Sequence, residues 1–107
     1  MGFIAVYITH ENEKAANLVC DYLLNKKVIA CANIFPISSS YWWSGKIANE
    51  KEWVSIVKTS TNNWKLLEKE VMLQHPYEVP CIMKMEVTAN EAYEKWIHES
   101  VIDSLNG

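Results

Sequence analysis

The pattern of hydrophobic and polar residues predicts an alternation of short strands and amphipathic helices. Residues 3–8 are apolar, with β-branched and aromatic members, which predicts a buried strand. Between residue 13 and about residue 26, hydrophobic residues recur at helical spacing, and Asn12 before them is a suitable N-cap. The apolar stripe of this helix consists of Ala16, Val19, Cys20, Leu23 and Leu24.

The middle of the chain is expected to form three more strands. Residues 28–37 are extended, and Pro36 marks an edge, bulge or bend because proline cannot donate a hydrogen bond to a neighbouring strand. Residues 41–60 alternate well enough to form two antiparallel strands, which we expect to be joined through residues 48–51.

Two further helices are predicted on either side of a last strand. Asn62 or Asn63 is expected to cap a helix that stops before Pro76, and Asn90 is expected to cap the terminal helix. Residues 81–87 form the strand between them. The order β-α-β-β-β-α-β-α contains the split βαβ plan of ferredoxin-like domains. The expected fold is an α+β, ferredoxin-like sandwich, with an antiparallel sheet and helices on one face.

The first strand is apolar on both of its sides, with Ile4, Val6 and Ile8 on one and Phe3, Ala5 and Tyr7 on the other. A sheet with helices on one face only should be polar on its other face in a monomer. Both faces of this sheet are therefore expected to be covered, and the free one most simply by other copies of the chain.

An aromatic run strengthens the expectation of self-association. Tyr41, Trp42 and Trp43 together carry roughly 450–750 Å² of surface, whereas the largest apolar patch of a monomer is about 300–600 Å². We expect these residues and Trp53 to pack between subunits, or alternatively to cover the sheet of their own domain.

Composition narrows the classes of function. The 107 residues are the size of one domain, here taken as residues 1–107, and half of them are hydrophobic. The net charge is −3 and the basic residues are scattered, which argues against nucleic-acid binding. No apolar run approaches the ~20 residues of a membrane span. Cys20, Cys31 and Cys81 are odd in number and widely spaced, so a reducing, cytoplasmic location is expected.

Several motifs follow one another along nearly the whole chain. They are Ala-Cys-Ala-Asn-Ile at 30–34, Tyr-Trp-Trp-Ser-Gly-Lys-Ile at 41–47, Lys58-Thr59, His-Pro-Tyr-Glu-Val-Pro at 75–80 and Tyr-Glu-Lys-Trp-Ile at 93–97. Together they resemble the CutA divalent-cation-tolerance family. The resemblance implies a ferredoxin-like subunit in a compact, PII-like homotrimer, and a link to tolerance of divalent metals, notably copper. Animal members of the family are associated with anchoring of an acetylcholinesterase, so the resemblance also implies a protein partner.

Five residues are candidates for a ligand pocket between subunits, namely Trp43, Lys58, His75, Tyr77 and Glu78. Lys58 interrupts an apolar strand, so it needs a partner such as a carboxylate or a bound anion. His75 stands at a helix end and either contacts a ligand or is a packed, hydrogen-bonded structural histidine, and the second interpretation is favoured.

Cys31 and His75 are the candidate metal ligands, because thiolate and imidazole suit copper or zinc. The sequence has no Cys-x-x-Cys or His-x-x-x-His spacing, so it does not predict a local tetrahedral site. His10 and His98 are expected to face solvent, and Glu52 is expected to be a charge at the start of a strand.

Function is predicted mainly by the resemblance. Phosphate-loop, nucleophile-elbow and zinc-protease motifs are missing from the sequence, so no catalytic residues are assigned and a non-enzymatic role is expected. The leading hypothesis is a trimer linked to divalent metal tolerance or copper binding. The alternative is a structural trimer that anchors or regulates a partner protein, or binds a small ligand at subunit interfaces.

Overall fold

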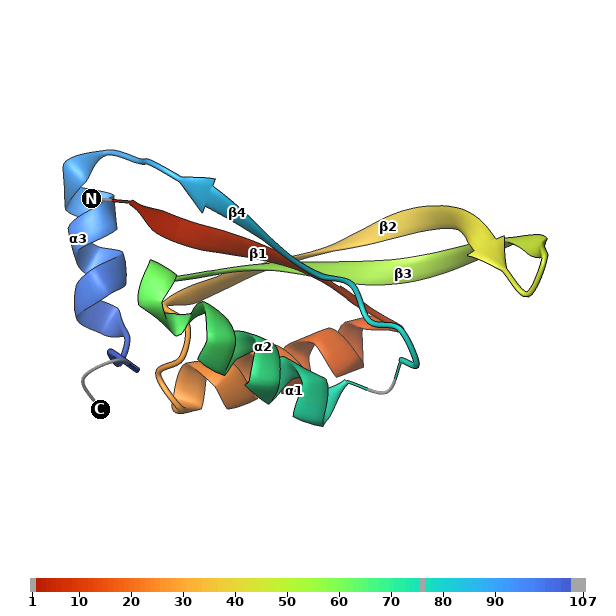
Figure 1. Ribbon diagram of the computed structural model, residues 1–107, viewed down its shortest axis with the longest axis horizontal. Coiled ribbons are helices and arrows are strands. Elements are labelled where there is room, and N and C mark those ends of the chain that lie inside the picture. The colour runs from red at the N-terminus through yellow and green to blue at the C-terminus, as the bar shows by residue number, and fades with distance from the viewer. Residues whose placement is uncertain (1, 76, 105–107) are drawn as a thin grey trace.

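The computed structural model describes residues 2–75 and 77–104, which form a single four-stranded sheet and three α-helices (Figure 1). In chain order the elements are β1 (Phe3–His10), α1 (Glu13–Asn25), β2 (Cys31–Trp43), β3 (Lys46–Thr59), α2 (Trp64–Gln74), β4 (Ile82–Val87) and α3 (Glu91–Ser100). A short 3₁₀ turn, Thr61–Asn63, precedes α2.

The sheet has the strand order β2-β3-β1-β4, and all neighbouring strands are antiparallel. Figure 1 shows α1 and α2 side by side beneath the sheet, while α3 stands across the end where the N-terminus lies. This arrangement confirms the predicted α+β, ferredoxin-like fold. The sheet has four strands and not the predicted five, because the segments expected at 28–37 and at the start of 41–60 form the single strand β2. None of the helices among the described residues is long and apolar enough to span a membrane.

The core lies between the sheet and the two helices beneath it. Ile4, Val6 and Ile8 of β1 are fully buried there, against Leu23 of α1 and Leu67 of α2. Four members of the predicted stripe of α1 are therefore confirmed as buried, whereas Leu24 is 38% exposed. The N-cap of α1 is also confirmed, because the Asn12 side chain accepts a hydrogen bond of 2.8 Å from the Ala15 amide.

The central hairpin differs from the prediction. β2 and β3 are two long, continuous strands that turn at Ser44-Gly45, and not shorter segments joined through residues 48–51. Ser44 and Gly45 have φ angles of 52° and 77°. Positive φ at both central positions is typical of a tight two-residue hairpin turn whose twist matches the flanking strands. Pro36 is accommodated because β2 is an edge strand.

Asn63 has a different role from the predicted cap. It forms no side-chain capping bond to α2, and its buried amide instead donates to the Thr59 hydroxyl and to the Ile102 carbonyl. Its side-chain oxygen accepts from the Ser104 amide. These bonds tie the segment after α3 to the end of the sheet.

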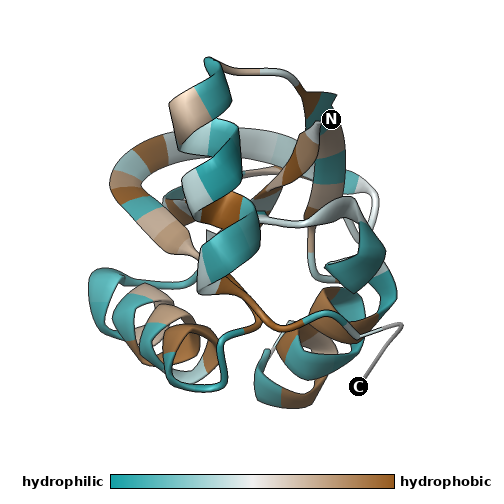
Figure 2. Cartoon of the chain, turned by 90° about the vertical axis from the view of Figure 1, so that its left-hand side faces the viewer, coloured by the Kyte–Doolittle hydropathy of each residue, from teal (hydrophilic) through white to brown (hydrophobic). Residues whose placement is uncertain are grey.

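The sheet face opposite α1 and α2 is largely uncovered in one chain. Phe35, Met83 and Met85 on this face are 36%, 49% and 39% exposed. α3 covers only one end of it, where the Tyr93 ring packs edge-on against Phe3 at 6.0 Å. Figure 2, viewed from that end, shows α3 in front of the strands with a mostly hydrophilic outward side.

Candidate functional site

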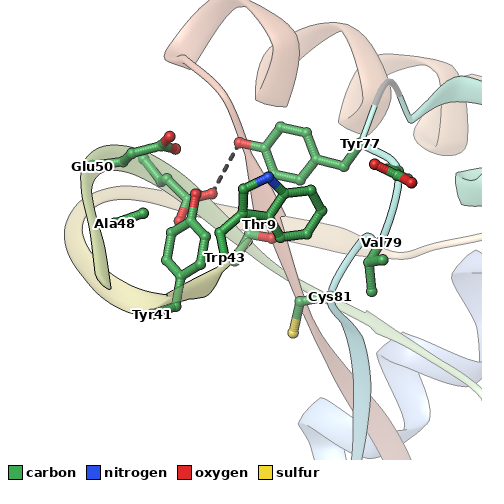
Figure 3. A pocket seen from close by; sticks show the side chains of 10 residues that line it. Thr9, Tyr41, Trp43, Ala48, Glu50, Tyr77, Val79 and Cys81 are labelled. Carbon is green, nitrogen blue, oxygen red and sulfur yellow. Dashed lines mark hydrogen bonds between the residues drawn. The ribbon is translucent and has the colours of Figure 1, made fainter. Parts of the chain in front are cut away.

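A cavity of about 440 Å³ lies near the end of the sheet remote from α3, where the β2–β3 hairpin meets the segment between α2 and β4 (Figure 3). Its polar and aromatic lining comprises Tyr41, Trp43, Glu50, Glu52, Tyr77 and Glu78. Cys81 and Thr9 also border it.

The hairpin supplies four of these side chains through strand alternation. Residues 41 and 43 on β2 point to one side of the strand, as do residues 50 and 52 on β3. Because the turn at Ser44-Gly45 fixes the register, Tyr41 pairs with Ala48, another residue of the cavity wall.

Glu52 is the most buried carboxylate of the cavity, with an exposed fraction of 7%. The Tyr77 hydroxyl donates a hydrogen bond of 2.9 Å to one of its oxygens. Burial, followed by this bond to Glu52, raises the pKa of the Tyr77 phenol, which therefore stays a neutral donor at physiological pH. Glu52 is thus a buried residue of the cavity wall in the middle of β3, and not a charge at the start of a strand as the sequence suggested.

His75 lies directly behind Tyr77. Its Nε2 donates to the Thr9 carbonyl, and its Nδ1 accepts a 3.2 Å hydrogen bond from the Tyr77 amide. The rings of His75 and Tyr77 also meet edge to face, with 4.6 Å between centroids. Both ring nitrogens are therefore engaged within the chain, as in a structural histidine.

His10 contradicts the expectation that it faces solvent. It is only 1% exposed, stacks on His75 with 5.7 Å between centroids, and shares a 2.7 Å hydrogen bond with the Ser55 hydroxyl. Burial, with a smaller contribution from the charge of His75, lowers the pKa of His10 to about 4. Extending the alternation of Ile4 and Ile8 to the end of β1 would have placed His10 on the buried face.

Lys58 and Cys31 lie together at the opposite end of the open sheet face. The Lys58 ammonium donates to the Asn33 side-chain oxygen at 3.0 Å and to the Tyr93 hydroxyl at 3.2 Å. The Cys31 sulfur is 3.4 Å from the same hydroxyl. Lys58 thus finds neutral oxygen partners in place of the carboxylate or anion that the sequence suggested.

The predicted ligand-pocket residues are therefore only partly together. Trp43, Tyr77 and Glu78 line the same cavity, and His75 supports it through Tyr77. Lys58 is opposite Ala5 near the start of β1 and does not reach the cavity.

The two candidate metal ligands are far apart within one chain. Cys31 pairs with Lys58, level with Ala5, whereas His75 contacts Thr9. Four residues along a strand correspond to about 13 Å. Among residues 2–75 and 77–104, no three or more His, Cys, Asp or Glu side chains are close enough together to hold a metal ion.

The residues expected to pack between subunits fall on both sides of the hairpin. Tyr41, Trp42 and Trp43 are 37%, 72% and 49% exposed in one chain. Trp53 is half-buried and pairs with His10, which places it on the helix side of the sheet.

His98 also departs from the expected solvent-facing position, because its ring nitrogens bond to Ser60 and to the Gly2 carbonyl.

Comparison with known proteins agrees with the fold. The family described as CutA1 divalent ion tolerance protein matches residues 4–100. The Divalent-cation tolerance protein CutA of Thermotoga maritima is 45% identical over 101 residues, covering 92% of this chain and 99% of that protein.

Solved structures give the same result. CutA1 from Oryza sativa superposes with a TM-score of 0.93 at 32% identity, over 97% of both chains. CutA1 from Pyrococcus horikoshii gives 0.89 at 39% identity, over 92% of this chain and 98% of that one. From its sequence and its fold, the chain belongs to the CutA1 divalent ion tolerance protein family.

Proposed function

We propose that the protein acts as a non-catalytic homotrimer in tolerance of divalent metal ions, copper in particular. The observation that carries this proposal is the uncovered apolar sheet face of a chain that belongs to a divalent-cation-tolerance family. The three free cysteines support a reducing, cytoplasmic location for the assembly.

The exposed hydrophobic residues favour a ring of subunits. Phe35 and Met83 lie on the open sheet face, while Trp42 and Ile47, 72% and 60% exposed, lie near the tip of the projecting hairpin. In a closed ring each subunit uses two different surfaces, so the hairpin of one chain can pack on the sheet face of the next. Stable interfaces of this kind bury about 1,200–2,000 Å² in total.

Cys31 and His75 remain the proposed contacts for copper. Cys31 lies level with Ala5 of β1, whereas His75 contacts Thr9 at the other end of that strand. A single ion would therefore have to bind Cys31 of one subunit and His75 of another. His75 must also give up one of its two ring hydrogen bonds to coordinate a metal. Cys31 is the easier ligand, since its observed hydrogen bond is a long one to the Tyr93 hydroxyl.

Native mass spectrometry of the purified protein tests the assembly. We expect a trimer at micromolar concentration, and a Met85→Glu variant, charged on the open face, should dissociate. A Lys84→Glu variant changes the neighbouring residue on the other side of β4 and should remain trimeric. A monomeric wild-type protein would overturn the trimer.

Calorimetric titration with copper tests the metal contacts. Cys31→Ser and His75→Ala should each weaken binding, whereas Cys81→Ser serves as the matched control. Burial and the charge of Glu52 raise the pKa of the Cys81 thiol, which makes it a poorer source of thiolate. Unchanged copper affinity in both of the first two variants would remove the assigned site and leave the trimer untouched.

The alternative of a trimer that binds a small ligand is favoured by one specific observation. The cavity beside Glu52 has a volume of about 440 Å³, which is within the range typical of small-molecule sites, about 300–1,000 Å³. A single chain supplies three carboxylates to its wall, those of Glu50, Glu52 and Glu78.

A further inference from the structure

We propose that this cavity binds a small organic cation carrying two or more ammonium groups, of the aliphatic diamine or polyamine class. The inference deepens the small-ligand form of the proposed function, and it rests on the chemistry of the cavity wall.

The charged side chains of the wall are all acidic. Glu50, Glu52 and Glu78 all border the cavity, and none of the ten described lining residues is Lys, Arg or His. The hydroxyls of Tyr41 and Tyr77 add no charge to the wall. A bond to Glu50 raises the pKa of Tyr41, while burial and the bond to Glu52 raise the pKa of Tyr77, so both stay neutral donors. An anion would therefore be repelled, whereas a cation would be attracted.

The remaining wall is aromatic. Figure 3 shows Tyr41 and Trp43 extending from the hairpin and Tyr77 from the opposite side, toward the same space. Faces of tryptophan and tyrosine rings attract ammonium groups and also pack well against methylene chains. A cation with an apolar stem can use both kinds of contact, which a bare inorganic ion cannot.

The carboxylates are arranged around the cavity and do not converge on one point. A divalent ion requires several oxygens at about 2.0–2.6 Å from a single centre. No such group of acidic, cysteine or histidine side chains exists among the described residues. Moreover, one oxygen of Glu52 already accepts from Tyr77. Separated charges on an elongated ligand match separated carboxylates better than one compact ion does.

The wall is also held in place before any ligand arrives. Glu52 is nine-tenths buried and bonded to Tyr77, and the Tyr77 amide is bonded to His75. His75 in turn donates to the Thr9 carbonyl at the end of β1. Preorganised groups lose less entropy on binding, so the cavity is suited to capture a flexible cation.

Native mass spectrometry and calorimetric titration with spermidine and 1,4-diaminobutane, at low ionic strength, test the proposal. Both should bind with one ligand per chain, and 1-butylamine should bind at least about fivefold more weakly than the diamine because it lacks the second charge. Glu50→Gln, Glu78→Gln and Trp43→Leu should each weaken diamine binding by about threefold or more.

Two matched controls use residues that do not line the cavity. Glu86→Gln removes an exposed carboxylate from β4, and Trp96→Leu removes an exposed tryptophan from α3. Both should leave the affinity within about twofold of the wild type.

Three results would overturn the inference: no diamine binding, equal binding of the monoamine, or displacement of the diamine by stoichiometric Mg²⁺. These results are distinguishable from failure of the proposed function, because native mass spectrometry counts subunits and ligands together. A trimer without bound amine refutes only the cation site, and a monomer with bound amine refutes only the trimer.

Discussion

Acidification should destabilise the protein through His10. This imidazole is 1% exposed and its pKa in the folded chain is about 4, compared with 6.5 when it is unperturbed. Between these two pH values the unfolded chain binds more protons than the folded chain does. The free energy of unfolding therefore falls as the pH falls, and the contribution of His10 is fully present only above about pH 6.5.

The size of the effect follows from the two pKa values. Each tenfold change in proton affinity corresponds to about 1.4 kcal/mol, so neutral His10 accounts for about 2–3 kcal/mol between pH 7.5 and pH 4.5. Below about pH 4 both states are protonated and this contribution levels off. The structural cause is local, because the ring is enclosed by the sheet, stacked on His75 and bonded to Ser55.

Urea unfolding of the wild type and of His10→Gln at a series of pH values measures the effect. Protein concentration must be held constant, since the proposed subunit association would contribute to apparent stability. At pH 7.5 the variant should be less stable, because a buried ring is lost. Toward pH 4.5 the difference should shrink by about 2–3 kcal/mol, as only the wild type has His10 to protonate.

A His98→Gln variant controls for loss of a histidine from the unfolded chain, and NMR titration of the His10 ring gives an independent check. A stability difference that stays constant with pH would refute this reasoning. So would a His10 ring that titrates near its unperturbed value.

Two further predictions concern the turn and the core. Gly45→Ala should destabilise the protein by about 1–2 kcal/mol in urea unfolding, because alanine disfavours the positive φ of this position. The added methyl group would clash with no atom, so the backbone conformation is the sole source of this cost. Ser44→Gly, at the other positive φ, should be neutral or slightly stabilising, and an equal loss in both variants would contradict the φ argument. Leu67→Ala should lower the free energy of unfolding by about 2–5 kcal/mol, because the Leu67 side chain is fully buried. Leu73 is 67% exposed on the same helix, so Leu73→Ala should lower it by less than about 0.5 kcal/mol. Similar losses in the two variants would contradict the assigned core.

The fold was predictable where local periodicity and capping agree. The stripe that includes Val19 and Leu23 placed α1 on the sheet, and Asn12 marked its first turn. The hairpin was harder, because Ser44-Gly45 is a weaker turn signal than Asn-Gly and the serines before it resemble a loop. In the structure those serines are paired strand residues opposite residues 49–51.

The candidate site was predictable only in part, because its contacts join distant segments. Trp43, Tyr77 and Glu78 were identified, but nothing local to Glu52 indicates that a tyrosine 25 positions later would bury and bind it. Lys58 was correctly expected to need a partner, yet the partners came from β2 and α3 and were neutral. Long-range pairing of this kind depends on the strand order, which the sequence pattern does not specify.

The hairpin links the two proposals physically. It carries Trp43, which lines the cavity, and its tip carries Trp42, which is available to a neighbouring subunit. An occupant held between the hairpin and Tyr77 would restrict the hairpin, and a restricted hairpin loses less entropy when it packs on another chain. Ligand binding and assembly would then favour each other by the same factor, as linkage requires. A ligand shifts the assembly by the ratio of its affinities for the trimer and for the single chain, so a coupled trimer should resist dilution better when the diamine is present.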